Sequence, residues 1–202
     1  MESNAIGQTS PQKRSVGRPR DPQVERRLKQ AALETLAKHG FSGLTLDRVC
    51  TTAGVPKATF YRRWPTPLAL VIEAFNERFE AGLMNETDNL RADLIEFSDR
   101  LIDLYADPIL GPCTASMITE AKMRPVELRS VMDAQSARRR HNRAVLERSL
   151  RAGGFETGLP AQLILSSLNG LAYFTYATGR QATQDQFALL IDKLLQPAIA
   201  NH

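Results

Sequence analysis

The stretch Leu44–Trp64, LTLDRVCTTAGVPKATFYRRW, decides how the N-terminal part of the chain folds. Thr45 is a suitable N-cap for a helix whose apolar residues recur at helical spacing. Gly54 is a suitable end for that helix, because glycine adopts positive φ without a Cβ penalty. Pro56 then suits the first turn of a second helix, where a missing N–H costs nothing. The stretch therefore predicts two short helices joined by a tight turn.

The second of these helices, Lys57–Arg63, has one face that is suited to packing. Phe60 and Trp64 lie four residues apart and are predicted to point inward, which leaves the polar residues of this helix on its outer faces. Cys50, a small residue, precedes the turn where the two helices must cross closely. This combination is typical of a helix-turn-helix.

The charge of the chain is unevenly distributed. Residues 1–65 carry twelve Lys and Arg against five Asp and Glu, a net charge of +7. Residues 66–202 carry fourteen against seventeen, a net charge of −3, which gives the overall +4. A basic first third on a mildly acidic remainder indicates a head that binds a polyanion and a body with another role.

Other features exclude several classes of protein. No stretch reaches the roughly twenty apolar residues of a membrane span, and no apolar segment of a secretory signal is present near residue 1. The three histidines and two cysteines follow no metal-ligand or catalytic spacing, and no glycine-rich phosphate loop occurs. We therefore expect a cytoplasmic, nucleoid-associated protein that is not an enzyme, with no cofactor, no metal and no membrane partner.

The first 21 residues are polar and lack apolar periodicity, which predicts a disordered basic arm. Within them, Val16–Arg20 (VGRPR) resembles the core of an AT-hook, in which Arg18 and Arg20 would enter a narrow minor groove. The alternative is a solvated tail that adds only non-specific affinity for DNA.

The remaining apolar periodicity is helical throughout, so the predicted fold class is all-α, with about nine helices. Besides the two helices above, the predicted helices are Pro22–His39, Thr66–Met84, Asp88–Asp107, Cys113–Met123, Glu127–Ala152, Pro160–Thr178 and Gln184–Ala200. We divide the chain into the arm (residues 1–21), a three-helix helix-turn-helix head (22–65) and a body for ligand binding and dimerisation (66–202).

The run AALETLAKHGFSGLTLDRVCTTAGVPKATFYRRWPTPLALVIEAF resembles the N-terminal domain of the tetracycline-repressor (TetR) family of transcription regulators. The shared positions are Gly40-Phe41, Thr45, Ala53-Gly54-Val55, Phe60-Tyr61 and Trp64. One departure is Pro67, which stands where the family commonly has a lysine that contacts a phosphate. The resemblance implies a DNA-binding head, a variable helical body that binds an effector, and a dimer.

The helix-turn-helix carries two kinds of DNA-contacting residue. Cations, a phenol and a helix N-terminus suit phosphate oxygens, whereas arginine and methyl groups suit base edges. The predicted phosphate contacts are Thr45, Lys57, Tyr61 and Arg63, and the predicted base contacts are Ala58, Thr59 and Arg62. The alternative for Arg62 and Arg63 is a solvated helix end.

The last two predicted helices carry more apolar surface than one protomer easily covers, which favours a four-helix interface between two copies. The predicted interface residues are Leu168, Leu171, Phe187, Leu190, Ile191, Leu194 and Leu195.

Helices of the body surround an effector pocket in the family that the chain resembles. The candidate pocket residues are Phe75, Phe79, Phe97, Leu101, Met117, Asn169 and Tyr173. The alternative for each apolar one is an ordinary core position. For the basic run Arg138–Arg140 we favour an exposed, solvated face, and the alternative is a site for an anionic effector.

These observations predict a homodimeric transcriptional repressor that a small-molecule effector releases from a palindromic operator in double-stranded DNA. The alternative is a sequence-tolerant DNA-organising protein without an effector. No residues support an enzyme in the helical body.

Overall fold

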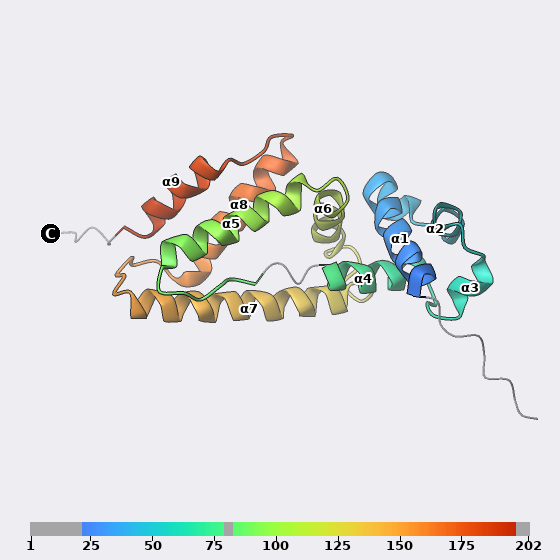
Figure 1. Cartoon of the computed structure of the whole chain (residues 1–202), viewed down its shortest axis with the longest axis horizontal. Helices are drawn as coiled ribbons and strands as arrows, with labels where there is room; N and C mark the ends of the chain where they lie inside the picture. Colours follow the sequence, from blue (N-terminus) through green and yellow to red (C-terminus); the bar gives the residue numbers. More distant parts are fainter. Residues whose placement is uncertain (1–21, 79–82, 197–202) are drawn as a thin grey trace, which may run out of the picture.

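The computed structural model describes residues 22–78 and 83–196. Within these ranges the chain forms nine helices and no strands, so the all-α prediction is confirmed. The helices are α1 (Pro22–Gly43), α2 (Leu46–Ala53), α3 (Lys57–Tyr61), α4 (Pro67–Arg78), α5 (Leu90–Ala106), α6 (Leu110–Glu120), α7 (Arg129–Ala152), α8 (Ala161–Ala177) and α9 (Gln184–Leu194). The molecule is elongated, with α1–α3 at one end and α5 and α7–α9 at the other (Figure 1).

The helix-turn-helix forms as its capping residues predict. The Thr45 side chain accepts a hydrogen bond from the Arg48 backbone N–H, and Gly54 adopts φ 61°. The Val55 N–H then donates to the Cys50 carbonyl at 3.0 Å, which closes the end of α2. The third helix is shorter than predicted, because it ends at Tyr61 and continues as a turn.

The first helix is interrupted where the sequence predicted its end. Gly40 has φ 63° inside the range of α1, so the helix is kinked there and resumes for one short turn. Only glycine adopts this conformation readily, which explains why the predicted break falls at this residue. The straight part of α1 packs against α2, α4 and α6.

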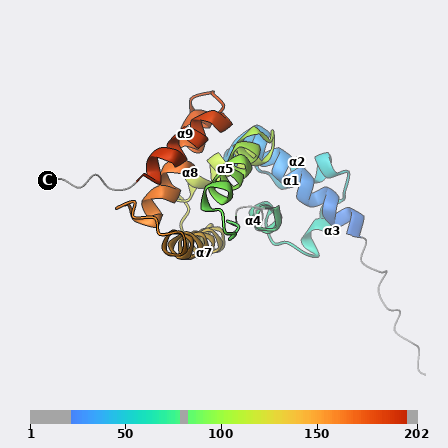
Figure 2. The same ribbon diagram turned by 60° about the vertical axis from the view of Figure 1, so that its left-hand side comes forward.

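Two apolar clusters hold the described structure together. The first lies under the head and joins residues of α1–α4 to α6 and to the start of α7. The second lies among α5, α7, α8 and α9. Helix α8 lies between α7 and α9, as the turned view also shows (Figure 2). Helices α4 and α6, which belong by sequence to the predicted body, thus contribute to the core of the head.

The sixth helix begins at Leu110, and the prediction that it begins at Cys113 was wrong. Pro112 does not break it, because the N–H groups of a first helical turn have no partner within the helix. Gly111 is required by a close approach, since a Cβ atom there would lie 2.7 Å from the Tyr105 carbonyl oxygen.

The last two helices leave apolar side chains uncovered in the protomer. Leu163 and Phe174 on α8 are 48% and 68% exposed, and Leu189 on α9 is 63% exposed. Helix α9 runs to Leu194, and the predicted continuation to Ala200 extends past the described residues. No helix in the described ranges is long and apolar enough to cross a membrane.

Candidate DNA-binding surface and body cavity

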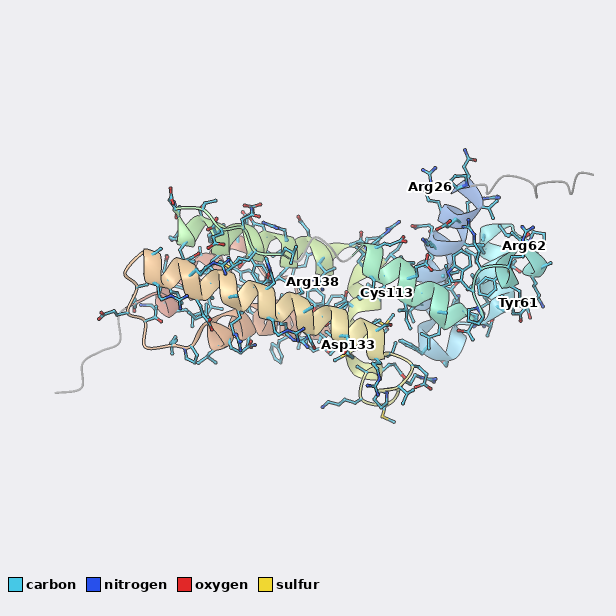
Figure 3. All side chains as sticks on the ribbon, turned by 90° about the horizontal axis from the view of Figure 1, so that it is seen from below. Arg26, Tyr61, Arg62, Cys113, Asp133 and Arg138 are labelled. Atoms are coloured by element: carbon cyan, nitrogen blue, oxygen red, sulfur yellow. The ribbon has the colours of Figure 1, made fainter. Side chains whose placement is uncertain are left out.

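The recognition helix α3 presents its polar residues outward, at the end of the molecule farthest from α9. Phe60 and Trp64 are buried as predicted, and they anchor the helix to the head. Tyr61 and Arg62 project from this end (Figure 3). Among the other predicted DNA contacts, Thr45, Lys57, Ala58 and Arg63 are exposed and Thr59 is half-buried. Arg18 and Arg20 lie outside the described residues.

Two of the predicted phosphate contacts are ion-paired within the protein. The Lys57 ammonium contacts the Asp47 carboxylate, and this hydrogen bond raises the pKa of Lys57. Arg63 pairs with Glu25 of α1. A phosphate that takes over either cation must therefore displace a carboxylate. Arg62, by contrast, has no ion pair within the described ranges, which leaves its guanidinium available to a base edge.

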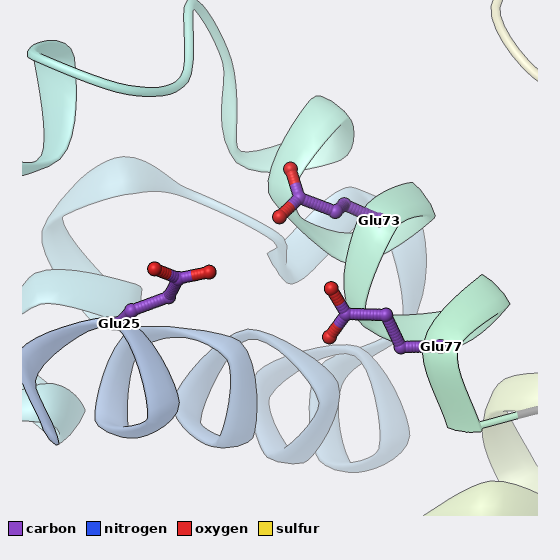
Figure 4. A group of neighbouring side chains, drawn as sticks. All are labelled: Glu25, Glu73 and Glu77. Carbon is purple, nitrogen blue, oxygen red and sulfur yellow. The ribbon is translucent and has the colours of Figure 1, made fainter. Parts of the chain in front are cut away.

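An ion network fastens α1 to α4 behind the recognition helix. Glu25, Glu73 and Glu77 point toward one another from the two helices (Figure 4). The Lys29 ammonium lies among them, at 2.7 Å from Glu25 and Glu73 and 2.6 Å from Glu77. Although partial burial opposes its charge, these hydrogen bonds raise the pKa of Lys29. The lysine supplies the positive charge that offsets the three neighbouring carboxylates.

The same network reaches the end of the recognition helix. The Trp64 indole N–H donates to Glu73 at 2.8 Å, which links the residue after the turn to α4. Thr66 caps α4, because its hydroxyl accepts the Ala69 N–H at 3.1 Å, and Pro67 occupies the first helical position. Thr66 therefore serves as the cap of α4.

Two exposed arginines of α1 extend the basic surface and were missed in the sequence analysis. Arg26 and Arg27 line a groove of about 450 Å³ together with Thr52 and Ala53 of α2. Arg26 projects from α1 on the side of the molecule that carries the head (Figure 3). The excess of basic residues in the first third was the available signal, but only a folded head shows which of them are exposed.

The body encloses a cavity of about 630 Å³ between α5, α6, α7 and α8. Four of the predicted pocket residues line it: Phe97, Leu101, Asn169 and Tyr173. Phe75 and Met117 do not, because both are buried in the apolar cluster of the head, and their assignment to the pocket was wrong. Phe79 lies outside the described residues.

Two arginines of the basic run Arg138–Arg140 line this cavity, although an exposed, solvated face was the favoured prediction for the run. Arg138 is half-buried and lines the cavity together with Arg139, whereas Arg140 is exposed and does not line it. The favoured solvated face therefore describes Arg140 but not Arg138. Burial and the neighbouring guanidinium of Arg139 lower the pKa of Arg138. Arg78 and Arg100 also line the cavity.

The polar lining includes residues whose role was not predicted. Tyr105 packs against Tyr173 and Tyr176, with ring centroids 6.2 Å and 5.1 Å away. Burial and these two neighbours raise the pKa of Tyr105 to about 12, so the phenol is a neutral hydrogen-bond donor. Thr114 of α6 is only 3% exposed, and its hydroxyl has no hydrogen-bond partner within the described structure.

Three of the predicted interface residues face the protomer's own core. Leu168, Phe187 and Ile191 are buried in the second apolar cluster, so they offer no surface to a partner and their assignment is corrected. Leu171, Leu190, Leu194 and Leu195 are partly buried against the same cluster. The large apolar residues that are exposed on these helices are Leu163, Phe174 and Leu189.

A helix-turn-helix with an outward recognition helix, on an all-helical body that holds a cavity, defines a class of DNA-binding regulators. The family model described as "Tetracyclin repressor-like, C-terminal domain" matches residues 84–194, and "Bacterial regulatory proteins, tetR family" matches residues 28–74. The chain therefore belongs to the TetR family of transcriptional regulators.

Individual relatives agree with this membership. The HTH-type transcriptional regulator Rv1556 of Mycobacterium tuberculosis is 29% identical over 195 residues, which cover 90% of this chain and 93% of the relative. The fold resembles that of the fatty acid degradation regulator FadR from Bacillus halodurans, with a TM-score of 0.71, 17% identity, and coverage of 88% and 97%. The flavonoid-responsive regulator FrrA aligns with a TM-score of 0.63, 22% identity, and coverage of 87% and 94%.

Proposed function

We propose that this TetR-family regulator is a homodimeric repressor, which an effector bound in the body cavity releases from a palindromic operator. The observation that carries the proposal is the position of α6, which lines the cavity and lies between α8 of the body and α1 of the head (Figure 1). A helix that contacts both regions can pass a change at the cavity to the DNA-binding surface.

The two faces of α6 support this coupling. Leu110, Thr114 and Ile118 line the cavity. Cys113 and Met117, on the adjacent stripe of the helix, are buried against the head, and the Cys113 thiol donates to the Leu33 carbonyl of α1 at 3.3 Å. Because packed helices move as rigid units, a ligand that displaces the first face also displaces the second.

The fourth helix offers a second connection. Arg78, in the last turn of α4, lines the cavity and donates a 2.5 Å hydrogen bond to Gln30 of α1. A ligand that reaches Arg78 would therefore bear on the α1–α4 contact that the Lys29 network also fastens. The effector shifts the equilibrium only by its differential affinity for the two states, on the order of 1–3 kcal/mol.

On DNA, the exposed end of α3 would enter the major groove, with Ala58, Thr59 and Arg62 at base edges. Thr45, Lys57, Tyr61 and Arg63 would contact phosphates, and Arg26 and Arg27 would add to the same electrostatic surface. Arg18 and Arg20 of the arm would follow into the adjacent minor groove.

The dimer would form through the apolar face of α8 and α9 that one protomer leaves exposed. Leu163 and Phe174 share a face of α8 with Gly170, whose side faces open space within the protomer. Pairing of this face with its symmetry mate would cover these side chains and fix the separation of the two heads.

The names of two proteins of similar fold support the proposal of a small-molecule effector. FrrA is described as flavonoid-responsive, and the FadR protein of Bacillus halodurans as a regulator of fatty acid degradation. The alternative function, a DNA-organising protein without effector, has the basic head in its favour but leaves the cavity unexplained.

The proposal is tested by selecting binding sites from random DNA with the full-length protein and footprinting the winners. A repressor of this type protects a palindrome with half-sites about one or more helical turns apart, with a specific affinity at least 10³-fold above that for random DNA. Uniform binding to all sequences would favour the DNA-organising alternative. A small-molecule screen for release of the protein from the selected site then tests the effector.

A further inference from the structure

We propose that the ligand of the body cavity is an amphipathic organic anion, a carboxylate on an apolar body, and that Arg138 receives its charged group. This inference rests on the proposed function, because it names the class of effector for the same cavity. Four features of the lining support it: its charge, the position of Arg138, the unpaired Thr114 hydroxyl and the apolar walls.

The lining carries more positive than negative side chains, with Arg78, Arg100, Arg138 and Arg139 against Asp103 and Asp107. The charge of Arg100 is offset by its ion pair with Glu96, which leaves Arg78, Arg138 and Arg139 against the two aspartates. An anionic ligand therefore meets a favourable field in this cavity, and a cationic ligand does not.

Within this set, Arg100 and Arg138 are half-buried, whereas Arg78 and Arg139 are exposed. Arg138 lies midway along α7 (Figure 3). It lines the cavity beside Arg139, so two guanidinium groups meet at this point of the wall.

The surroundings of Arg138 favour a partner with negative charge. Its guanidinium is partly withdrawn from water and lies beside the guanidinium of Arg139, and both effects lower its pKa. A carboxylate placed there would offset both, and the planar guanidinium matches the two carboxylate oxygens.

The Thr114 hydroxyl of α6 indicates a second polar contact for the ligand. Thr114 lines the cavity from α6 and is 3% exposed, and its Oγ1 has no hydrogen-bond partner among the residues described. A buried hydroxyl without a partner is unfavourable, and a polar atom of the ligand would remove that cost. Because Thr114 belongs to the helix that contacts the head, this contact also lies on the proposed route of release.

Most of the other lining residues are apolar, which favours a ligand with an apolar body. Phe97, Leu101, Leu104, Leu110, Ile118 and Leu165 line the cavity. The volume of about 630 Å³ lies within the range of small-molecule sites, roughly 300–1,000 Å³, and is too large for an inorganic anion alone. Charge at one point and apolar walls elsewhere together specify an amphipathic acid.

The test is calorimetric titration of the full-length protein with matched probes that differ in charge. The pairs are decanoate with decan-1-ol and 4-phenylbutyrate with 4-phenylbutan-1-ol, below the micelle concentration, with decylammonium as the cationic probe. At least one carboxylate should bind wild type ~10-fold or more tightly than its alcohol, as a charge-assisted hydrogen bond requires. Decylammonium should bind more weakly than either member of its pair.

The variants are Arg138→Gln, Arg138→Lys and, as the matched control on the same helix, Arg140→Gln. Arg138→Gln should weaken carboxylate binding ~10- to 100-fold and leave the alcohol unchanged, whereas Arg138→Lys should retain part of the preference and Arg140→Gln nearly all of it. Circular dichroism checks that each variant is folded. If Arg138→Gln does not fold, the comparison of Arg138→Lys with wild type provides the test.

Three results would overturn the inference: equal affinities within both pairs, tighter binding of decylammonium, or absence of carboxylate binding to wild type at 1 mM. Operator binding is measured in parallel on the same samples. Operator binding without charge preference in the cavity would refute the ligand class and leave the regulator intact. Arg138-dependent carboxylate binding without release of DNA would instead refute the proposed release mechanism and leave the ligand class intact.

Discussion

The Lys29 side chain links α1 to α4 in the head through several ion pairs. Three carboxylates, of Glu25, Glu73 and Glu77, lie within 4.8 Å of one another, and the lysine ammonium is the cation that they share. Its hydrogen bond is the main cause that lowers the pKa of Glu25, and it also lowers the pKa of Glu73 against the effect of burial. We therefore expect the α1–α4 contact to depend on pH.

Lys29→Met should make this dependence visible. In wild type the lowered carboxyl pKa values stabilise the fold above about pH 4.5, and that stability is lost as the pH falls through them. In the variant the three carboxylates repel one another, so the pKa values of Glu25 and Glu73 rise and protonation relieves the repulsion. Because the carboxylates are 31–55% exposed and water screens their charges, we expect a loss of only about 1 kcal/mol at pH 7, which shrinks at pH 4.

Urea unfolding at both pH values measures the change, with the exposed Lys38→Met on the same helix as control. An equal loss at pH 7 and pH 4 would show that the lysine contributes only its packing.

Arg62 and Lys57 should respond differently to removal, because one is predicted to read bases and the other to hold a phosphate. Arg62→Ala is expected to cost about 1–3 kcal/mol on the operator and little on random DNA. Lys57→Ala should weaken both alike and reduce the salt slope by about 1. Its net effect is reduced by the ion pair with Asp47, which DNA must break. Band shifts on operator and random duplexes over a salt series measure these quantities, and equal losses for Arg62→Ala on both would exclude base reading.

At the scale of elements, α6 has the most demanding position. It packs against α1 and α5, and Gly111 near its start approaches the Tyr105 carbonyl so closely that a Cβ atom would lie 2.7 Å from the oxygen. We therefore expect α6 to transmit a displacement instead of absorbing it.

Gly111→Ala should therefore destabilise the protein and disturb the coupling. The backbone atom it would meet cannot turn away as a flexible side chain does, so we expect a loss of about 1–3 kcal/mol and a changed operator affinity. Thermal unfolding and band shifts measure the two effects, with Thr119→Ala on the exposed face of α6 as control. Unchanged stability would indicate that α6 shifts freely.

At the scale of the whole molecule, α8 and α9 present an exposed apolar surface, and we propose that a second copy of the chain covers it. Phe174 and Leu189 are 68% and 63% exposed on α8 and α9, which pack against each other. Gly170 faces open space between two exposed residues of α8.

Phe174→Glu should convert the dimer to a monomer, because the new charge would be buried without a partner. Light scattering coupled to gel filtration measures the mass, and operator affinity should fall with it. Met123→Glu is the matched control, since Met123 is 77% exposed but lies between α6 and α7. An unchanged mass for Phe174→Glu would move the interface to another face.

The helix-turn-helix was predictable from the sequence because its determinants are local. A cap at Thr45, positive φ at Gly54 and two aromatic residues four positions apart act within one or two helical turns. The charge split and the family resemblance of the first domain rest on the same short stretch. Helix periodicity likewise gave the all-α class and most of the helix positions.

The tertiary structure decided which side of each helix faces which neighbour. Phe75 and Met117 were equally apolar candidates for the cavity, but they pack into the head, and Leu168 points into its own protomer. Arg138 lines the cavity although the adjacent Arg140 meets solvent. An apolar or basic pattern specifies that a helix has a buried face, whereas the packing of distant helices specifies what that face contacts.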